Sequence, residues 1–228
     1  MRCLQLQNKP TVFSKLLRFV LLVAIASVLA FGLILVGIPK WIVFILIIFL
    51  YLAFTVYWPA HIIYKSKSIN AIHRYVRRNY NQPIFSYSYA LGNGNDEDIE
   101  VALKRVMKTY DQEDMYDVYG ANLAIHHNNP DEVLEHAKNI EGLDYQHYYH
   151  AYAYVLQGRL DEAAAHLEKL ETPWMVHSIK AVVAKRRGDK EVFGNEATKS
   201  IESALGMQRY VLHHTMRRLA QDIKKIKP

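Results

Sequence analysis

Two long apolar segments lie near the start of the chain. Residues 19–38 and 41–60 each run for 20 residues without an acidic or basic side chain. As helices rising 1.5 Å per residue, each would cover about 30 Å, the thickness of the hydrocarbon core of a bilayer. Gly37, Ile38, Pro39 and Lys40 form a turn signal between them. The pattern therefore predicts a transmembrane helical hairpin over residues 19–60.

Beyond residue 112 the apolar positions follow a helical spacing that repeats every 30 residues. Each repeat has a turn residue between two helical segments and a small residue seven positions before that turn. These residues are Ala121 and Asn128, Ala151 and Gly158, and Ala181 and Gly188. A period of this size is typical of helical-repeat proteins, so we expect three helix–turn–helix repeats over residues 113–205.

The middle repeat resembles the tetratricopeptide repeat. Its turn, Gly158-Arg159-Leu160-Asp161-Glu162-Ala163, is similar to the inter-helix turn of that family. Ala151 and Tyr154 match the family's small and aromatic packing positions, although the family's unit is four residues longer. The resemblance implies a right-handed superhelix, packed through the alanines and glycines named above, with a concave face that binds a protein or peptide.

Two further segments flank the repeats. Residues 81–112 predict a degenerate N-terminal helical pair, in which Pro83 opens the first helix and Asn95 caps the second. Residues 206–228 predict a basic amphipathic helix that caps the solenoid; contact with an anionic surface or an acidic partner is the alternative. The expected fold class is all-α, with a two-helix transmembrane hairpin followed by a tetratricopeptide-like α-solenoid.

The charges are unevenly distributed along a chain of 228 residues, of which 51% are hydrophobic. Residues 1–80 contain ten Lys or Arg and no Asp or Glu, whereas residues 81–171 contain 6 basic and 17 acidic residues. Of the ten, four lie in a basic N-terminus, residues 1–18, and five in a basic juxtamembrane helix, residues 61–80; Lys40 alone lies in the turn. The positive-inside rule then predicts a two-span membrane protein with both termini in the cytoplasm.

A cleaved signal peptide is the alternative interpretation of the first apolar segment. Basic residues precede it, and Ala24-Ile25-Ala26 resembles a cleavage site. The apolar run continues well past that site and a second one follows directly, which favours two membrane spans. Cys3 is the single cysteine, so no intramolecular disulfide forms; acylation of Cys3 is conceivable, and an idle thiol is the simpler interpretation.

Three tyrosines share one face of the first helix of the middle repeat, at spacings of three and four. In a tetratricopeptide-like register they would point into the concave groove together with polar residues of the neighbouring repeats. The predicted groove consists of Tyr145, Tyr148, Tyr152, Asn122, His126, Lys185 and Arg186. Tyrosines beside a few polar groups suit peptide recognition. The alternative is that some of these tyrosines pack between helices.

Other motifs do not predict a catalytic site. His147 and His150 have a chelating spacing, but no Cys and no His-Glu-x-x-His motif accompanies them. The loop Gly92–Asn95 is followed by acidic residues rather than the Gly-Lys-Ser/Thr of a phosphate loop. The acidic block of residues 81–171 disfavours nucleic-acid binding. We therefore expect no enzyme activity, no cofactor and no metal.

The leading hypothesis is a membrane-anchored adaptor or scaffold whose cytoplasmic repeat domain binds a protein or peptide partner. The alternative is an accessory or regulatory subunit of a membrane complex, contacted through the hairpin itself. A metal-dependent hydrolase that uses the histidines is a third and weaker hypothesis. The lack of eukaryotic sorting signals favours a bacterial source.

Overall fold

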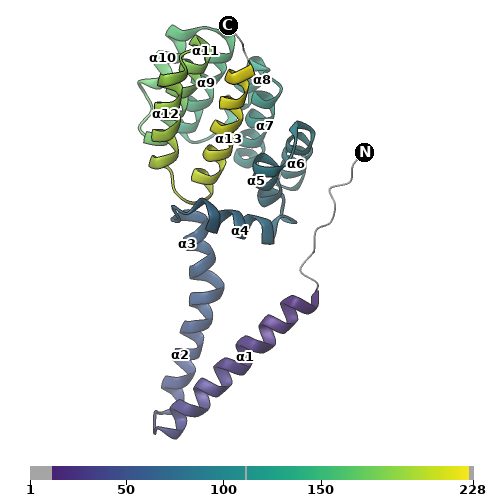
Figure 1. Cartoon of the computed structure of the whole chain (residues 1–228), viewed down its shortest axis with the longest axis vertical. Helices are drawn as coiled ribbons and strands as arrows, with labels where there is room; N and C mark the ends of the chain where they lie inside the picture. Colours follow the sequence, from purple (N-terminus) through teal and green to yellow (C-terminus); the bar gives the residue numbers. More distant parts are fainter. Residues whose placement is uncertain (1–11, 111, 226–228) are drawn as a thin grey trace. The chain divides into compact units, whose positions relative to one another are not determined.

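The computed structural model describes residues 12–110 and 112–225, and every regular element in these ranges is a helix. The all-α prediction is therefore confirmed. The chain forms two compact units, Met1–His61 and Ile62–Pro228 (Figure 1). Cys3 and most of the predicted basic N-terminus lie outside the described residues, as do the last three residues of the predicted capping helix.

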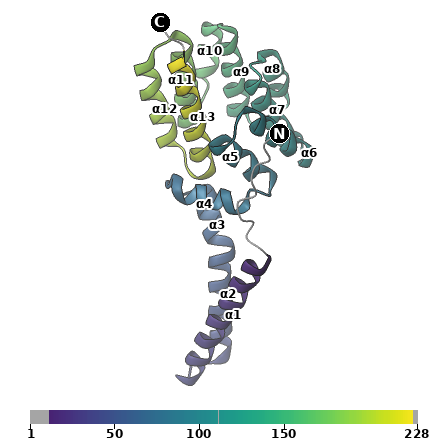
Figure 2. The same ribbon diagram turned by 45° about the vertical axis from the view of Figure 1, so that its right-hand side comes forward.

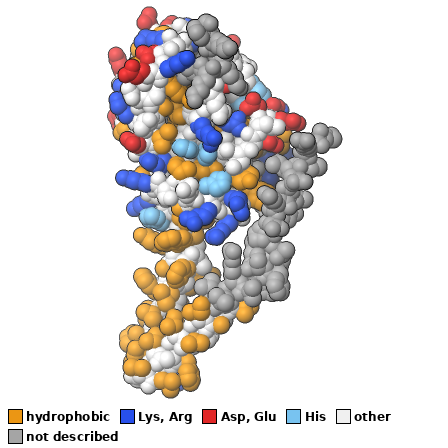
Figure 3. All heavy atoms as spheres, in the orientation of Figure 1, with side chains coloured by type: hydrophobic (Ala, Val, Ile, Leu, Met, Phe, Trp, Pro, Cys, Tyr) orange, Lys and Arg blue, Asp and Glu red, His pale blue; other side chains and the backbone are white. Residues whose placement is uncertain are grey.

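The first unit contains the apolar helices. Helix α1 covers Val12–Leu35, and a turn with Gly37 at φ +88° leads into α2, Lys40–Leu52. A π-helical turn, Ala53–Tyr57, joins α2 to α3, Trp58–Tyr64, so that one helix continues for 25 residues. Its hydrophobic side chains are largely exposed along α2 (Figure 3).

Within the described residues, one helix, Lys40–Tyr64, is long and apolar enough to cross a membrane. It contains the second predicted span, residues 41–60, and continues four residues further. The first predicted span lies on α1 and the turn after it; within the part of α1 whose side chains the structure describes, Ala24–Leu35 is an apolar stretch. The two-helix hairpin thus stays a prediction.

The second unit begins with three helices. Helix α4, Ile69–Asn79, starts where the Ser68 hydroxyl accepts a hydrogen bond from the backbone N–H of Ala71. Helix α5 spans Pro83–Asn93, and α6 spans Asp96–Thr109 behind a capping box. The predicted juxtamembrane helix over residues 61–80 is therefore two helical pieces, separated by the non-helical residues 65–68.

Six helices then alternate in pairs at a 30-residue interval. They are α7 (Glu113–His126), α8 (Pro130–Asn139), α9 (Leu143–Gln157), α10 (Leu160–Leu167), α11 (Pro173–Arg187) and α12 (Lys190–Ser203). The turn residues Asn128, Gly158 and Gly188 all have positive φ, of 53°, 81° and 77°. Glycine adopts this conformation freely and asparagine tolerates it better than most residues, so one backbone turn recurs in all three repeats.

Small residues and repeated hydrogen bonds hold neighbouring helices together. Ala121, Ala151 and Ala181 are fully buried (0% exposed), which lets the backbones of packed helices approach closely. The Asp114 carboxylate accepts a hydrogen bond from the Glu141 N–H at 2.8 Å, and Asp144 accepts one from the Glu171 N–H at 3.0 Å. Each aspartate thus joins the start of one repeat to the chain entering the next.

The last helix, α13, spans Gly206–Lys225 and packs against four others: α4, α5, α11 and α12. Both ribbon views show it beside α12 and α5 (Figures 1 and 2). A cap would contact the last helix pair alone. Helix α13 reaches the first helices of this unit as well as the last.

Candidate functional site

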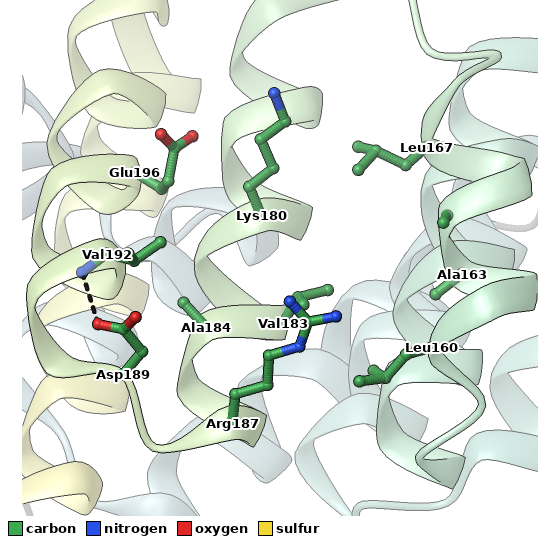
Figure 4. Close-up of a pocket in the computed structure, with 11 residues that line it drawn as sticks. Leu160, Ala163, Leu167, Lys180, Val183, Ala184, Arg187, Asp189, Val192 and Glu196 are labelled. Carbon is green, nitrogen blue, oxygen red and sulfur yellow. Dashed lines mark hydrogen bonds between the residues drawn. The ribbon is translucent and has the colours of Figure 1, made fainter.

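An open groove of about 370 Å³ lies between α10 and α12, with α11 as its floor. Its apolar lining comes mainly from α10 and α11, including Leu160, Leu167 and Val183 (Figure 4). Helix α10 contributes only Leu160–Leu167, two turns, whereas α12 runs for 14 residues. Val192, on the α12 side of the groove, is 45% exposed. The groove is thus an apolar surface that no other element of the described chain fills.

The charged residues that line this groove are two cations without an ion pair and two carboxylates that already have partners. Lys180 and Arg187 are exposed, and neither forms an ion pair with a described residue. Figure 4 shows Arg187 reaching from α11 toward α10. The two lining carboxylates are already engaged: Asp189 caps α12, and Glu196 binds His177 at 2.7 Å and Lys199 at 2.9 Å. The groove therefore offers two cations beside an apolar floor.

Hydrogen bonding also keeps Glu196 ionised. Burial alone would raise the pKa of Glu196, but the hydrogen bonds from His177 and Lys199 outweigh it and lower that pKa. Glu196 is therefore an ionised carboxylate that is paired with His177 and Lys199.

The three predicted groove tyrosines occupy different environments. Tyr145 is 40% exposed and meets Trp174 edge-on, whereas Tyr152 is 6% exposed and belongs to the core between α9 and α11. Tyr148 is intermediate in exposure, and its hydroxyl lies 3.2 Å from that of Ser178. Burial raises the pKa of Tyr148 to about 12. Packing between helices thus accounts for Tyr152, and only Tyr145 keeps a large exposed surface.

The other predicted groove residues are dispersed over separate contacts. Asn122 donates a hydrogen bond to the Tyr149 hydroxyl at 2.9 Å, and a ring nitrogen of His126 lies 3.1 Å from the Asp96 carbonyl oxygen. Lys185 forms an ion pair of 3.2 Å with Asp222 of α13. Arg186 is exposed. Their role in binding a partner stays a prediction.

Helix α13 covers the side of α11 that carries Lys185 and also contacts the first helices of the second unit. Tyr210 of α13 is fully buried, and its hydroxyl lies 3.0 Å from Nδ1 of His73 on α4. Arg218 donates hydrogen bonds to the carbonyl oxygens of Leu91 (2.9 Å) and Gly94, and lies 3.1 Å from the Asp96 carboxylate. These contacts attach α13 to α4, to α5 and to the loop before α6. The sequence pattern gave no signal for this arrangement.

Each repeat also contains one polar pair between its two helices, at a separation of 19 residues. The pairs are Asp117–His136 at 2.7 Å, His147–His166 at 3.1 Å and His177–Glu196 at 2.7 Å. The outer pairs join a histidine to a carboxylate, but the middle pair joins two imidazoles, one of which must accept the hydrogen bond. Burial, with the neighbouring His150, His147 and Lys169, lowers the pKa of His166 to about 4. Burial, with the charges of Lys169 and His150, also lowers the pKa of His147, so both imidazoles are neutral at physiological pH.

The histidines were the strongest candidates for a metal site. His150 stacks on His166 with ring centroids 4.9 Å apart, but its Nδ1 bonds the Gln146 carbonyl oxygen. Across the described part of the chain, no group of three or more His, Cys, Asp or Glu side chains is arranged to hold a metal ion.

Comparison of the chain with models of protein families, with curated proteins and with solved structures finds no match. The site is therefore interpreted from its own chemistry.

Proposed function

We propose that this protein is a membrane-anchored adaptor whose helical-repeat unit binds a segment of a partner protein. The groove between α10 and α12 is the observation that carries the proposal, because it combines an open apolar floor with two cations. The fitting ligand is an amphipathic helix with an apolar face and acidic residues beside it, a common mode of peptide recognition. The large apolar contacts would supply affinity, and the charges would select the partner.

The anchor in this proposal is the hairpin predicted for residues 19–60. Helix Lys40–Tyr64 supplies one span, and α1 supplies the other. The positive-inside rule then puts the repeat unit on the cytoplasmic side, since Lys40 is the one basic residue of the connecting turn. An adaptor of this kind would hold its partner at the membrane surface.

The experiment is capture of partners from membranes by the full-length protein, with a charged substitution in the groove. Val192→Asp places a carboxylate at the groove edge and should abolish capture of the partner. Val101→Asp is the matched control, because Val101 is also an exposed valine on a helix, at 61% exposure, and lies on α6 away from the groove. Both variants should unfold at the wild-type temperature.

The tyrosine face is tested in the same assay. Tyr145→Ala removes the one predicted groove tyrosine that keeps a large exposed surface. Loss of capture in Tyr145→Ala with normal capture in Val192→Asp would move the binding site to the α9 face. Normal capture in both variants would refute a binding site on the repeat unit and favour the alternative, a subunit contacted through its apolar helices.

A further inference from the structure

The strongest unassigned surface is the outer face of α4. Arg74, Arg77 and Arg78 lie within about 100° of one another around this helix, since successive residues are about 100° apart. All three are exposed. Lys65 and Lys67, in the connection before α4, are exposed as well. We call these five residues the α4 basic face.

The opposite face of α4 is fully committed to the protein core. Ile72 and Val76 are 0% exposed and pack in one cluster with Phe85 and Tyr210. The hydrogen bond between His73 and Tyr210 fixes the helix further. Because these contacts fix the rotation of α4 about its own axis, the arginines are held outward as a preformed surface.

No described acidic side chain pairs with the α4 basic face. The chain has no Asp or Glu before Asp96, so the charged residues between positions 62 and 95 are all Lys or Arg. In Figure 3, Lys and Arg side chains gather over the region of α4. These five cations repel one another and have no acidic partner in the described chain, so binding of an external anion would lower their repulsion.

We propose that the α4 basic face binds the headgroups of anionic phospholipids; this inference rests on the membrane anchor of the proposed function. Lys65 directly follows Tyr64, the last residue of the apolar helix. Lys67 is three residues beyond Tyr64, within about 10 Å of chain length. Basic clusters at this distance from a span are attracted to the negative surface of the cytoplasmic leaflet.

An acidic protein partner fits this face less well. Protein interfaces have an apolar or aromatic centre surrounded by polar residues. The outward arc of α4 between Arg77 and Arg78 carries Arg74 and the polar Asn70 but no apolar side chain, because Ile72 and Val76 face the core. A surface of headgroups needs charge alone, spread over several lipids.

The test measures which lipids gather around the full-length protein in vesicles. A donor dye is attached at Gln82→Cys, an exposed position close to α4, after Cys3→Ser removes the natural thiol. Energy transfer is then compared for acceptor-labelled phosphatidylserine and acceptor-labelled phosphatidylcholine. We expect several-fold enrichment of phosphatidylserine, and we expect it to fall as the salt concentration rises.

Variants separate the α4 basic face from the rest of the protein. The triple change Arg74→Gln, Arg77→Gln and Arg78→Gln should remove most of the enrichment. A control with the same loss of charge away from α4 and from the groove, Lys108→Gln, Lys138→Gln and Lys190→Gln, should keep it; these lysines are exposed and form no ion pair with a described residue. Circular dichroism should show the same helix content in both variants.

Two outcomes would overturn the inference, and they differ in what they say about the anchor. Equal transfer to both lipids from protein that resists alkaline extraction would refute headgroup binding and leave the anchor intact, with an acidic protein as the remaining partner for this face. Release of the protein by alkali would refute the anchor and the inference together.

Discussion

Gly206, the first residue of α13, is the position where one added methyl group should disturb the second unit most. Its backbone has φ +55°, and its N–H donates a hydrogen bond of 2.8 Å to the Ser66 carbonyl oxygen. A Cβ at this position would lie 1.9 Å from the carbonyl oxygen of Ile63. Because the obstructing atom belongs to the backbone, no side-chain rotation can relieve the clash.

The expected cost of Gly206→Ala follows from these contacts. A left-handed conformation costs a residue with a Cβ about 1–2 kcal/mol. Moving α13 away from Ile63 would lose the hydrogen bond to Ser66, about 1 kcal/mol more, together with part of the packing around Tyr210. We expect a loss of about 3 kcal/mol in the free energy of unfolding. The assay is urea unfolding of the full-length protein in mild detergent, followed by circular dichroism.

Gly188→Ala is the matched control. Gly188 also has positive φ, +77°, but a Cβ there would meet no atom within 4 Å. It should therefore cost only the conformational term, about 1–2 kcal/mol. If the two variants lose the same stability to within about 0.5 kcal/mol, the close approach of Gly206 to Ile63 makes no contribution and the reasoning is wrong.

Three further predictions follow from the same structure. Ala151→Trp should destabilise the protein by a few kcal/mol, because Ala151 is 0% exposed between packed helices; wild-type unfolding would refute the repeat register. Burial first, then the neighbouring imidazoles and arginines, lowers the pKa of His214 to about 4, so the unfolded chain binds more protons below pH 6.5. The contribution of His214 to stability should therefore fall by roughly 1–2 kcal/mol between pH 7 and pH 4, and His214→Gln should reduce the loss of stability over that range by this amount; an unchanged profile would contradict it. A tag in the turn Gly37–Lys40 should be accessible from outside intact cells and a reporter after Pro228 should not; the reverse pattern would refute the orientation.

The local structure of the repeats could be predicted from the sequence because turn and cap residues act within a few positions. Gly158 and Gly188 end helices in the left-handed conformation that favours glycine, and Pro130 and Pro173 begin helices at the residues where they stand. The helix boundaries of the repeats could therefore be predicted from such short-range rules, and the 30-residue period from the regular spacing of the turn residues and of the small residues.

The candidate site could not be predicted in the same way. An apolar stripe shows that one face of a helix is buried, but it does not show against what. For this reason the sequence could not distinguish Tyr152, which is a core residue, from the other tyrosines predicted to line the groove. The groove of α10 and α12 depends on α10 ending at Leu167, and the burial of Tyr210 depends on α4, which lies more than 130 positions earlier in the chain.

The path of α13 has a consequence for the order in which the protein is made. The contacts His73–Tyr210 and Leu91–Arg218 join residues 137 and 127 positions apart, and α13 is the last helix described. During synthesis the apolar helices leave the ribosome before the repeats, and the repeats leave it before α13 can cover the surfaces that bind it. The packing of this unit is complete only when α13 has been made, since contacts so distant in sequence form late and slowly. A chain that stops before Gly206 would leave the apolar surfaces of α4, α5 and α11 uncovered, and such a product is expected to be a substrate for chaperones and proteases.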